Sequence, residues 1–208
     1  MINETSTKTF VNNNLVIADR FIKLQTLYSN ITHEIVKVHD KRLDREVVLK
    51  IIKNKKNKYL LENEFKVIVK LNSPYIIRGY ELYSIDDYDF YSMELIESNF
   101  RLNYLNDYVH GIFKAFELLH KKGFIHDDIK LNNFLFENTR VVLIDFSKAK
   151  KVKTYTEIAS ENQKLVRFMV QWINYNLEID LLGNPRSAEN YINKKDLDKL
   201  TNIFYRKG

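Results

Sequence analysis

Apolar and polar residues alternate with a period of two over much of the first half of the chain. Residues 23–40 follow this alternation reasonably well, and residues 41–53 come after a polar turn. Within the first stretch, one side would carry Ile31, His33, Ile35 and Lys37, and the other Thr32, Glu34, Val36 and Val38. Such alternation is typical of strands that bury one face. The pattern predicts a small antiparallel sheet that begins with a hairpin and a third strand.

Two further strands are predicted over residues 74–98, joined by an acidic turn at residues 85–89. Another hairpin is predicted over residues 134–145. Residues 1 to about 18 are mostly polar, with room for one short strand or helix over residues 10–22. We therefore expect the first 20 residues to form an extension before the sheet.

Apolar residues recur at helical spacing in four other segments. The first helix is predicted over residues 58–72, before Pro74, and the second over residues 103–122, where Gly123 fits a C-terminal cap. Two more are predicted over residues 160–176 and 187–207. On the first helix, the expected apolar side consists of Leu60, Leu61, Phe65, Ile68, Val69 and Leu71.

The composition sets limits on the kind of protein. The chain has 208 residues, of which 45% are hydrophobic, including 13 Tyr and 13 Phe, so it can bury one core or two small lobes. The absence of Cys excludes disulfides and thiolate metal sites. Neither a leader peptide nor an apolar stretch of about 18 residues is present, so we expect no membrane insertion and a cytoplasmic location.

The net charge of +6 comes largely from two short basic runs. One run contains Lys53, Lys55, Lys56 and Lys58, and the other contains Lys148, Lys150, Lys151 and Lys153. Basic runs of this length are usually solvated loops. Because no nucleic-acid-binding motif accompanies them, nucleic acid is not the expected partner.

Candidate chemistry is concentrated in residues 124–136, FIHDDIKLNNFLF, and in DFS at residues 145–147. Phosphoryl transfer needs an oriented hydroxyl, a metal on the phosphate oxygens and cations where negative charge develops. Asp128 could orient the hydroxyl and accept its proton, while Lys130 could neutralise the transferred group. Asn133 and Asp145 offer the oxygen ligands that Mg²⁺ prefers. The alternative is that these residues only form a turn and the end of a strand.

Taken together, these two stretches resemble the protein kinase family, whose catalytic loop reads H-R-D-L-K-x-x-N and whose metal site reads D-F-G. The resemblance implies an α+β, bilobal fold. It would comprise a small antiparallel sheet with one helix over residues 21–97 and a reduced, mainly helical lobe with the catalytic loop over residues 98–208. It also implies ATP and Mg²⁺ as cofactors.

The same resemblance extends to residues before the catalytic loop. Lys50, in VVLKII, resembles the strand lysine that contacts the α and β phosphates, and Glu64, ten residues before Pro74, resembles its helical partner. Glu62 is then a solvent-side acid. For Lys50 alone, the alternative is an edge-strand lysine that points to solvent.

Other positions are assigned to the nucleotide only by their place in the resemblance. Met93 resembles the gatekeeper, and Glu94 and Ile96 resemble hinge residues that offer backbone groups to adenine. Leu135 resembles the residue that forms the floor of the adenine pocket, although an apolar strand residue is equally expected in plain core.

The chain departs from the family pattern at several points. The glycine-rich loop is replaced by Tyr28, Asn30 and His33, none of which is Gly. Asp127 stands where the family usually has Arg, and an Asp cannot pair with a phosphorylated segment. We therefore expect activity that does not depend on phosphorylation of Thr154, Tyr155 or Thr156. No A-P-E motif follows, so the second lobe is expected to be reduced.

Lys130, two residues after Asp128, resembles Ser/Thr protein kinases more than small-molecule kinases, whose loop resembles H-G-D-L-H-x-x-N. The size resembles the minimal kinases of bacterial effectors and some viruses, so we expect a monomer that acts on a host protein inside a host cell. The run from Lys148 to Lys153 favours an acidic substrate sequence. A pseudokinase scaffold and a small-molecule kinase remain the alternatives.

Overall fold

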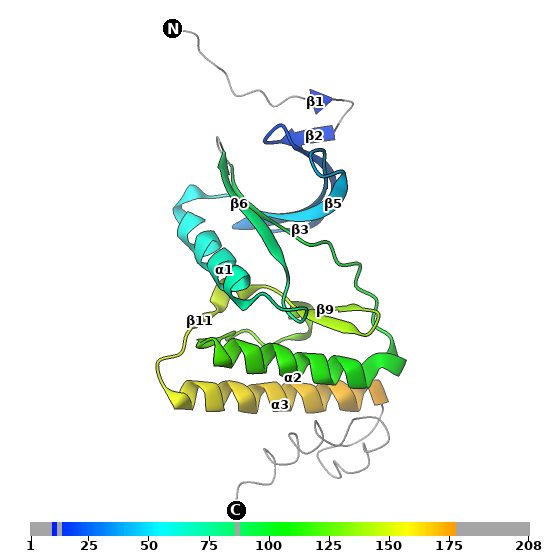
Figure 1. Cartoon of the computed structure of the whole chain (residues 1–208), viewed down its shortest axis with the longest axis vertical. Helices are drawn as coiled ribbons and strands as arrows, with labels where there is room; N and C mark the ends of the chain where they lie inside the picture. Colours follow the sequence, from blue (N-terminus) through cyan, green and yellow to red (C-terminus); the bar gives the residue numbers. More distant parts are fainter. Residues whose placement is uncertain (1–9, 12–13, 86–87, 178–208) are drawn as a thin grey trace, which may run out of the picture. The chain divides into compact units, whose positions relative to one another are not determined.

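The computed structural model describes residues 10–11, 14–85 and 88–177 (Figure 1). The chain divides into two compact units. The first comprises Met1–Lys70 and Arg78–Leu95, and the second comprises Leu71–Ile77 and Ile96–Gly208. The α+β class expected from the sequence is confirmed, because a curled antiparallel sheet is combined with three long helices in the described residues. The helix predicted over residues 187–207 lies outside them.

An antiparallel sheet of seven strands forms most of the first unit. Its strand order is β1-β2-β3-β4-β5-β7-β6. The strands are β1 (Phe10–Val11), β2 (Asn14–Ile17), β3 (Phe21–Ser29), β4 (His33–Asp40), β5 (Arg45–Ile52), β6 (Gly79–Ile85) and β7 (Tyr88–Met93). Because β2 pairs with β3, the sheet includes residues that precede the boundary expected at residue 20.

The buried face of the sheet follows the alternation in the sequence. Val36 and Val38 on β4 are fully buried, and they join Phe21, Leu49 and Phe90 in one hydrophobic core. The expected alternation is wrong at Ile31, however, which is 91% exposed in the turn between β3 and β4. A short turn therefore joins two separate strands, β3 and β4, where periodicity alone predicted one continuous strand.

Helix α1 (Lys58–Leu71) has almost the predicted bounds, and a short 3₁₀ turn, η1 (Lys55–Asn57), precedes it. Its buried stripe is narrower than predicted, since Leu60 and Val69 are largely exposed. The buried positions are Leu61, Glu64, Val67, Ile68 and Leu71, which recur at helical spacing along one side of the helix. The buried side of α1 therefore includes one acidic residue, Glu64.

Two long helices, one hairpin and one further pair of short strands form most of the described part of the second unit. Helix α2 (Leu105–Lys121) follows a 3₁₀ turn, η2 (Leu102–Tyr104), and helix α3 (Tyr155–Leu177) comes last. Strands β9 (Phe134–Glu137) and β10 (Arg140–Leu143) form the predicted hairpin. Strands β8 (Phe124–Ile125) and β11 (Lys150–Lys151) form a pair that periodicity did not predict.

Helix α3 begins five residues earlier than predicted. The side chain of Glu157 accepts hydrogen bonds from the backbone N–H groups of Lys153 and Thr154, at 2.6 and 3.1 Å. Thr154 and Glu157 are spaced as in a capping box, in which an acidic residue at the third helical position satisfies N–H groups at the helix start. The T-x-x-E sequence was therefore a signal for this helix start.

Aromatic residues fill the core of the second unit. The Phe136 and Trp172 rings stack with centroids 5.5 Å apart, and the Phe134 and Phe168 rings stack at 5.3 Å. These contacts join β9 to α3. No helix in the described ranges is both long enough and apolar enough to cross a bilayer.

Helix α2 packs closely on β10 at Gly111. A Cβ atom added at this position would lie 2.5 Å from Cγ1 of Val141, a buried residue, and 3.2 Å from the ring of Tyr75. Carbon atoms do not approach to 2.5 Å without displacing one another, so a side chain at Gly111 would force the helix and the hairpin apart.

We predict that Gly111→Ala lowers the free energy of unfolding by about 1–2 kcal/mol, because overpacking outweighs the gain in helix propensity. Urea denaturation would measure the change. Combining it with Val141→Ala, which removes the opposing methyl groups, should cost less than the sum of the two single losses. A stabilised Gly111→Ala variant would contradict this packing.

Candidate active site

Lys50 and Glu64 form a buried ion pair in the first unit. Nζ of Lys50 donates to both carboxylate oxygens of Glu64, at 2.7 and 2.8 Å, and the two residues are only 4% and 3% exposed. Strand β5, which carries Lys50, lies between β4 and β7, so Lys50 is not an edge-strand lysine that points to solvent. Glu62, by contrast, is partly exposed and forms a long ion pair with Lys66, at 3.9 Å.

The turn between β3 and β4 stands where the resemblance places a glycine-rich loop. Oδ1 of Asn30 accepts hydrogen bonds from the N–H groups of Thr32 and His33, each at 2.8 Å, and the N–H of Asn30 donates to the carbonyl of His33. Lys53 holds the same turn, because its Nζ donates to the Asn30 carbonyl at 2.6 Å.

Backbone N–H groups that bind phosphate must point at the ligand. In this turn the N–H groups of Asn30, Thr32 and His33 are committed to partners within the turn. The turn is therefore held by its own side chains, and these three groups are not offered to a ligand. The Lys53 run is correspondingly not a simple solvated loop, since Lys58 also forms an ion pair, with Asp89 at 2.9 Å.

Three of the four positions assigned to adenine recognition lie at the end of β7 and just beyond it. Met93 is the last residue of β7 and pairs with Val48. The N–H of Glu94 donates to the carbonyl of Arg78 at 3.0 Å, so Glu94 would have to use its carbonyl to recognise a base. Ile96, in the second unit, is buried. Their roles in nucleotide binding stay predictions.

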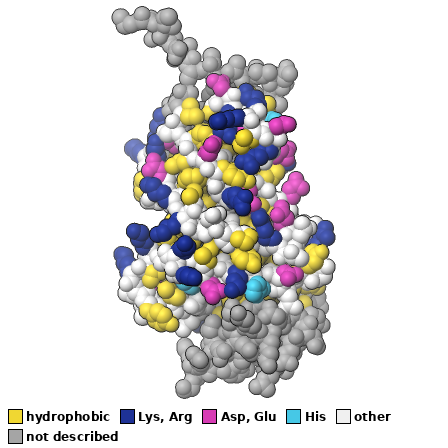
Figure 2. All heavy atoms as spheres, viewed as in Figure 1, with side chains coloured by type: hydrophobic (Ala, Val, Ile, Leu, Met, Phe, Trp, Pro, Cys, Tyr) yellow, Lys and Arg dark blue, Asp and Glu magenta, His cyan; other side chains and the backbone are white. Residues whose placement is uncertain are grey.

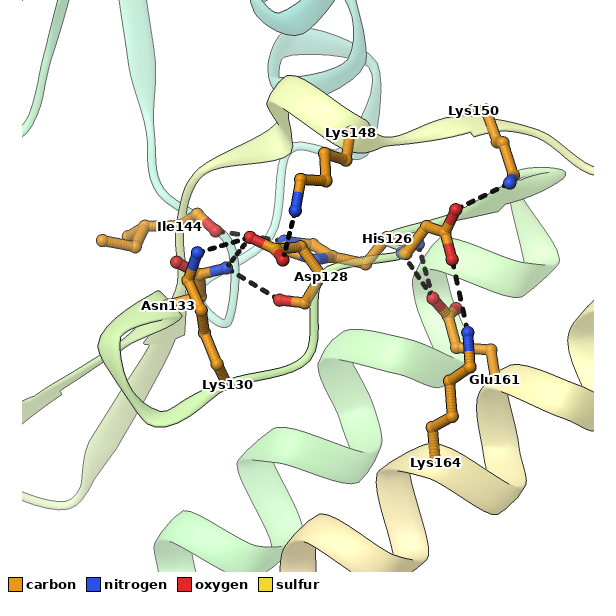
Figure 3. A network of polar contacts seen from close by, with 10 residues as sticks. His126, Asp128, Lys130, Asn133, Ile144, Lys148, Lys150, Glu161 and Lys164 are labelled. Atoms are coloured by element: carbon orange, nitrogen blue, oxygen red, sulfur yellow. Dashed lines mark hydrogen bonds and ion pairs between the residues drawn. The ribbon is translucent and has the colours of Figure 1, made fainter.

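In the second unit, the catalytic loop converges on Asp128 (Figure 3). Oδ2 of Asp128 accepts hydrogen bonds from Nζ of Lys130 at 2.6 Å and from Nδ2 of Asn133 at 3.1 Å. Nδ2 of Asn133 also donates to the Asp128 carbonyl, at 2.7 Å. The structure therefore brings together three residues that the sequence singled out.

A residue that sequence reasoning did not assign completes the surroundings of Asp128. Lys148, in the short 3₁₀ turn η4 (Phe146–Lys148), donates from Nζ to Oδ1 of Asp128 at 2.8 Å. Burial raises the pKa of Asp128, but the hydrogen bonds from Lys130, Lys148 and Asn133 outweigh burial and hold the pKa well below its usual range. Asp128 is therefore an ionised hydrogen-bond acceptor at neutral pH.

Asn133 and Asp145 are brought close through the backbone. The N–H of Ile144, the residue before Asp145, donates to the carbonyl of Asn133 at 2.9 Å. Asn133 ends the turn η3 (Leu131–Asn133) and is buried, whereas Asp145 is half-buried with a positive φ of 60°. Asn133 uses its amide nitrogen to hold Asp128, which leaves its amide oxygen for another partner.

The donor atoms at this point suit a hard cation. Asparagine and carboxylate oxygens are ligands that Mg²⁺ accepts, and Mg²⁺ commonly takes one or two protein ligands together with phosphate oxygens and water. Within residues 10–11, 14–85 and 88–177, no group of three or more His, Cys, Asp and Glu residues could hold a metal by itself. Asn133 and Asp145 therefore fit a metal that is shared with phosphate.

Glu161 on α3 anchors the predicted catalytic loop, a role that sequence reasoning did not assign to it. Its Oε1 accepts hydrogen bonds from the backbone N–H groups of His126 and Asp127, both at 2.8 Å. Its Oε2 lies 2.7 Å from Nε2 of His120 on α2. The residue is only 3% exposed, so its charge is satisfied entirely by protein groups in this network.

His126 lies inside the same loop and is fully buried. Its Nε2 donates to the carbonyl of Ile144 at 3.1 Å, and its ring packs against Phe146 with centroids 5.0 Å apart. Burial lowers the pKa of His126, which keeps the imidazole neutral. His126 is therefore a structural link between the loop and the strand that precedes Asp145.

Asp127 faces lysines on two other elements. Its Oδ2 accepts a hydrogen bond from Lys150 on β11 at 2.6 Å, and its Oδ1 lies 3.5 Å from Nζ of Lys164 on α3. The hydrogen bond from Lys150 lowers the pKa of Asp127. Lys148 and Lys150 are thus paired with acids, which corrects the expectation that residues 148–153 form only a solvated basic loop.

Leu135 is carried by β9, where it pairs with Val142 of β10. Its neighbours Phe134 and Phe136 point into the core, while Leu135 lies on the half-buried side of the hairpin. It is therefore not a fully buried core residue, and its predicted contact with adenine stays a prediction.

Residues 32–169, more than half of the chain, match the protein kinase domain family. The chain belongs to this family, as the sequence resemblance indicated. Members of this family use ATP and a divalent metal in general.

Individual relatives are distant. The chain is 22% identical to a probable serine/threonine-protein kinase of Dictyostelium discoideum over 71% of this chain and 33% of that protein. It is 27% identical to a probable serine/threonine-protein kinase of Clostridium perfringens over 68% of this chain and 23% of that protein. A calcium/calmodulin-dependent protein kinase type 1 of Macrobrachium nipponense is 26% identical over 51% of this chain and 36% of that protein. The chain thus spans about a third or less of the length of these relatives.

On the face drawn in Figure 2, lysine and arginine side chains are interspersed with aspartate and glutamate rather than gathered in one patch. The ion pairs described above show the same mixing at close range, since Lys50, Lys130, Lys148 and Lys150 each contact a carboxylate. Some basic side chains are therefore neutralised locally by acids, whereas the net charge of +6 is the excess of basic over acidic residues in the whole chain.

We predict that Glu64→Gln lowers the free energy of unfolding by about 3–5 kcal/mol, because it removes the charged carboxylate that accepts both hydrogen bonds from the buried ammonium of Lys50. Urea denaturation would measure the loss. Glu62→Gln on the same helix is the matched control and should change stability by less than about 0.5 kcal/mol. The double variant Lys50→Met, Glu64→Leu should be more stable than Glu64→Gln, and a less stable double variant would contradict this account.

Proposed function

We propose that this protein transfers the γ-phosphoryl group of ATP to a serine or threonine hydroxyl of a protein, with Mg²⁺ as cofactor. The observation that carries the proposal is the arrangement of Asp128, which is held by Lys130 and Asn133 next to the strand end that bears Asp145. A chain of the protein kinase domain family that keeps this arrangement has the groups that phosphoryl transfer requires.

Asp128 would act as the residue that orients the acceptor hydroxyl and takes its proton. The hydroxyl oxygen forms a bond to the γ-phosphorus while the bond from phosphorus to the β–γ bridging oxygen breaks, and ADP leaves. Lys130, which is half exposed, would place positive charge beside the transferred group. The low pKa of Asp128 favours orientation of the hydroxyl over early removal of its proton.

Asn133, through its amide oxygen, and Asp145, through its carboxylate, would hold the divalent metal. When bound, Mg²⁺ would neutralise charge on the phosphate oxygens. The hydrogen bonds from Nδ2 of Asn133 to Asp128 support this assignment, because they orient the amide so that its oxygen points elsewhere.

In the first unit, Lys50 would contact the α and β phosphates, and Glu64 would orient it. Met93, Glu94, Ile96 and Leu135 would contact the adenine. Three N–H groups of the Asn30 turn are bonded within the turn, so they would not contribute to nucleotide binding. Nucleotide affinity would therefore depend more on Lys50 and on the metal than it does in a kinase that has a glycine-rich loop.

Two observations support a protein substrate. Lys130 stands two residues after Asp128, as in the loop of protein kinases, and the Dictyostelium and Clostridium relatives are named as probable serine/threonine-protein kinases. The resemblance to minimal kinases of bacterial effectors and some viruses supports a host protein as substrate and a monomeric enzyme. Lysines around the loop, including the exposed Lys151 and Lys153, support an acidic substrate sequence.

We predict Mg²⁺-dependent transfer of labelled phosphate from ATP to protein. Asp128→Ala and Asp145→Ala should each lower the rate about 100-fold or more, because each removes a positioned charge from the reacting groups. Asp128→Ala should keep most of the nucleotide affinity. Lys114→Met is a suitable control, since the side chain of Lys114 is partly exposed and forms an ion pair with Glu117 on the same helix.

The same assay separates the alternatives when the purified protein is incubated with labelled ATP and a cell lysate. Label on protein supports the proposal, and label on small molecules alone indicates a small-molecule kinase. Nucleotide binding without transfer indicates a pseudokinase. Equal rates for the wild type and for both aspartate variants would overturn the catalytic assignment.

We also predict that activity is independent of phosphorylation. Asp127 already pairs with Lys150 on the segment that follows Asp145, and a phosphate there would be repelled by the carboxylate. Phosphatase treatment should leave the rate within about twofold of the untreated value.

The ion pair itself can be tested by charge reversal. Asp127→Lys combined with Lys150→Asp should recover activity that either single change lowers. A loss of activity after phosphatase treatment would contradict the prediction.

A further inference from the structure

The two carboxylate oxygens of Asp128 are held by different parts of the chain. Oδ2 accepts from Lys130 and Asn133, which belong to the same loop as Asp128, and these two donors occupy both of its lone pairs. Oδ1 accepts from Lys148 alone among the described residues. A hydroxyl that hydrogen-bonds to Asp128 would therefore bind to Oδ1, beside the ammonium of Lys148.

The backbone on either side of Lys148 is fixed. Phe146 is buried against His126, and the N–H of Ala149 donates to the carbonyl of Phe146 at 3.0 Å. Beyond it, β11 pairs with β8, and the N–H of Val152 donates to the carbonyl of Gly123 at 2.9 Å. Only the side chain of Lys148 is left to move, so its ammonium stays within reach of Oδ1.

The side chain of Lys148 is also open to a second partner. It is 61% exposed, whereas that of Asp128 is 15% exposed. An ion pair with one largely exposed partner is weak and readily rearranged. An ammonium has three N–H donors, so it can contact Oδ1 of Asp128 and a second anion at the same time.

Lysines gather around the two adjacent carboxylates of this loop (Figure 3). Asp128 is paired with Lys130 and Lys148, and Asp127 is paired with Lys150 and Lys164, so four lysines face two carboxylates. The nearby carboxylates of Glu157 and Glu161 already accept backbone N–H groups. A negative group on the substrate would therefore meet the largely exposed ammonium of Lys148 at this point.

We propose that Lys148 is a specificity-determining residue that selects a serine or threonine flanked by an aspartate or glutamate, by contacting that side chain while it remains on Oδ1 of Asp128. The proposal rests on the phosphotransfer function proposed above, and it names the residue that reads the substrate. Lys150 and Lys164 are less suited to this role because both face Asp127, one residue away from the loop carboxylate.

The test uses the full chain and pairs of peptides with one central serine. The two peptides of a pair differ at one position, which lies within two residues of the serine on either side. This position is Glu in one peptide and Gln in the other, and the two side chains have almost the same shape. The ratio of kcat/KM for the two peptides is measured with one enzyme preparation, so the fraction of folded protein cancels. Wild type should prefer Glu at one or more positions by about tenfold, mainly through KM.

Lys148→Met, which keeps the apolar stem without the charge, should reduce this ratio to about one, and Lys148→Glu should reverse it in favour of a lysine-containing peptide. Lys114→Met is the matched control and should keep the wild-type ratio. Transfer without a preference in wild type, or an unchanged ratio in Lys148→Met, would overturn the role of Lys148 alone. No transfer to any peptide or protein would overturn the proposed function and, with it, this inference.

Discussion

The buried carboxylate of Glu161 is the interaction on which the arrangement of the catalytic loop depends. It accepts the N–H groups of His126 and Asp127 and contacts His120, so one side chain on α3 joins the loop, α3 and α2. Without it, two buried N–H groups would lose their acceptor, which is costly in a protein interior. Because Asp127 adopts a positive φ of 58°, which is unfavourable for a non-glycine residue, this anchoring also offsets local backbone strain.

The anchored loop accounts for the positions of the groups around it. His126 reaches the carbonyl of Ile144, and Asn133 accepts the N–H of the same residue, so the loop is fastened to the strand end just before Asp145. Phe146 then turns back over His126. Lys148 consequently lies over Asp128 only two residues later, which explains how a short segment can supply a second lysine to the central carboxylate.

The two units differ in how the polar groups proposed to bind the nucleotide and the substrate are hydrogen-bonded within the protein. In the first unit, Lys50 already has a buried counter-charge and the Asn30 turn has internal hydrogen-bond partners, so this unit is preorganised without a ligand. In the second unit, the lysines that contact Asp128 are half to largely exposed. Exposed lysines rearrange at low cost, so adaptation to a substrate is expected in the second unit.

The sequence by itself determined most of the elements and the identity of the central polar residues. Period-two alternation located the strands from β3 to β7, helical spacing located α1 and α2, and the spacing of His126, Asp128 and Asn133 indicated a loop with chemistry. These signals are local, because each depends on residues that are close in the sequence and belong to one helix, strand or loop.

The resemblance had already paired Lys50 with Glu64 rather than with Glu62, as the structure has it. Only the tertiary structure decided the other charge contacts: Glu161 holds a loop that lies 34 and 35 residues before it, and Lys148 and Lys150 pair with Asp128 and Asp127. The start of α3 and the turn at Ile31 were also missed, although T-x-x-E was a usable signal for the former. Contacts between residues far apart in sequence depend on how elements pack, and periodicity within one element carries no information about its partner.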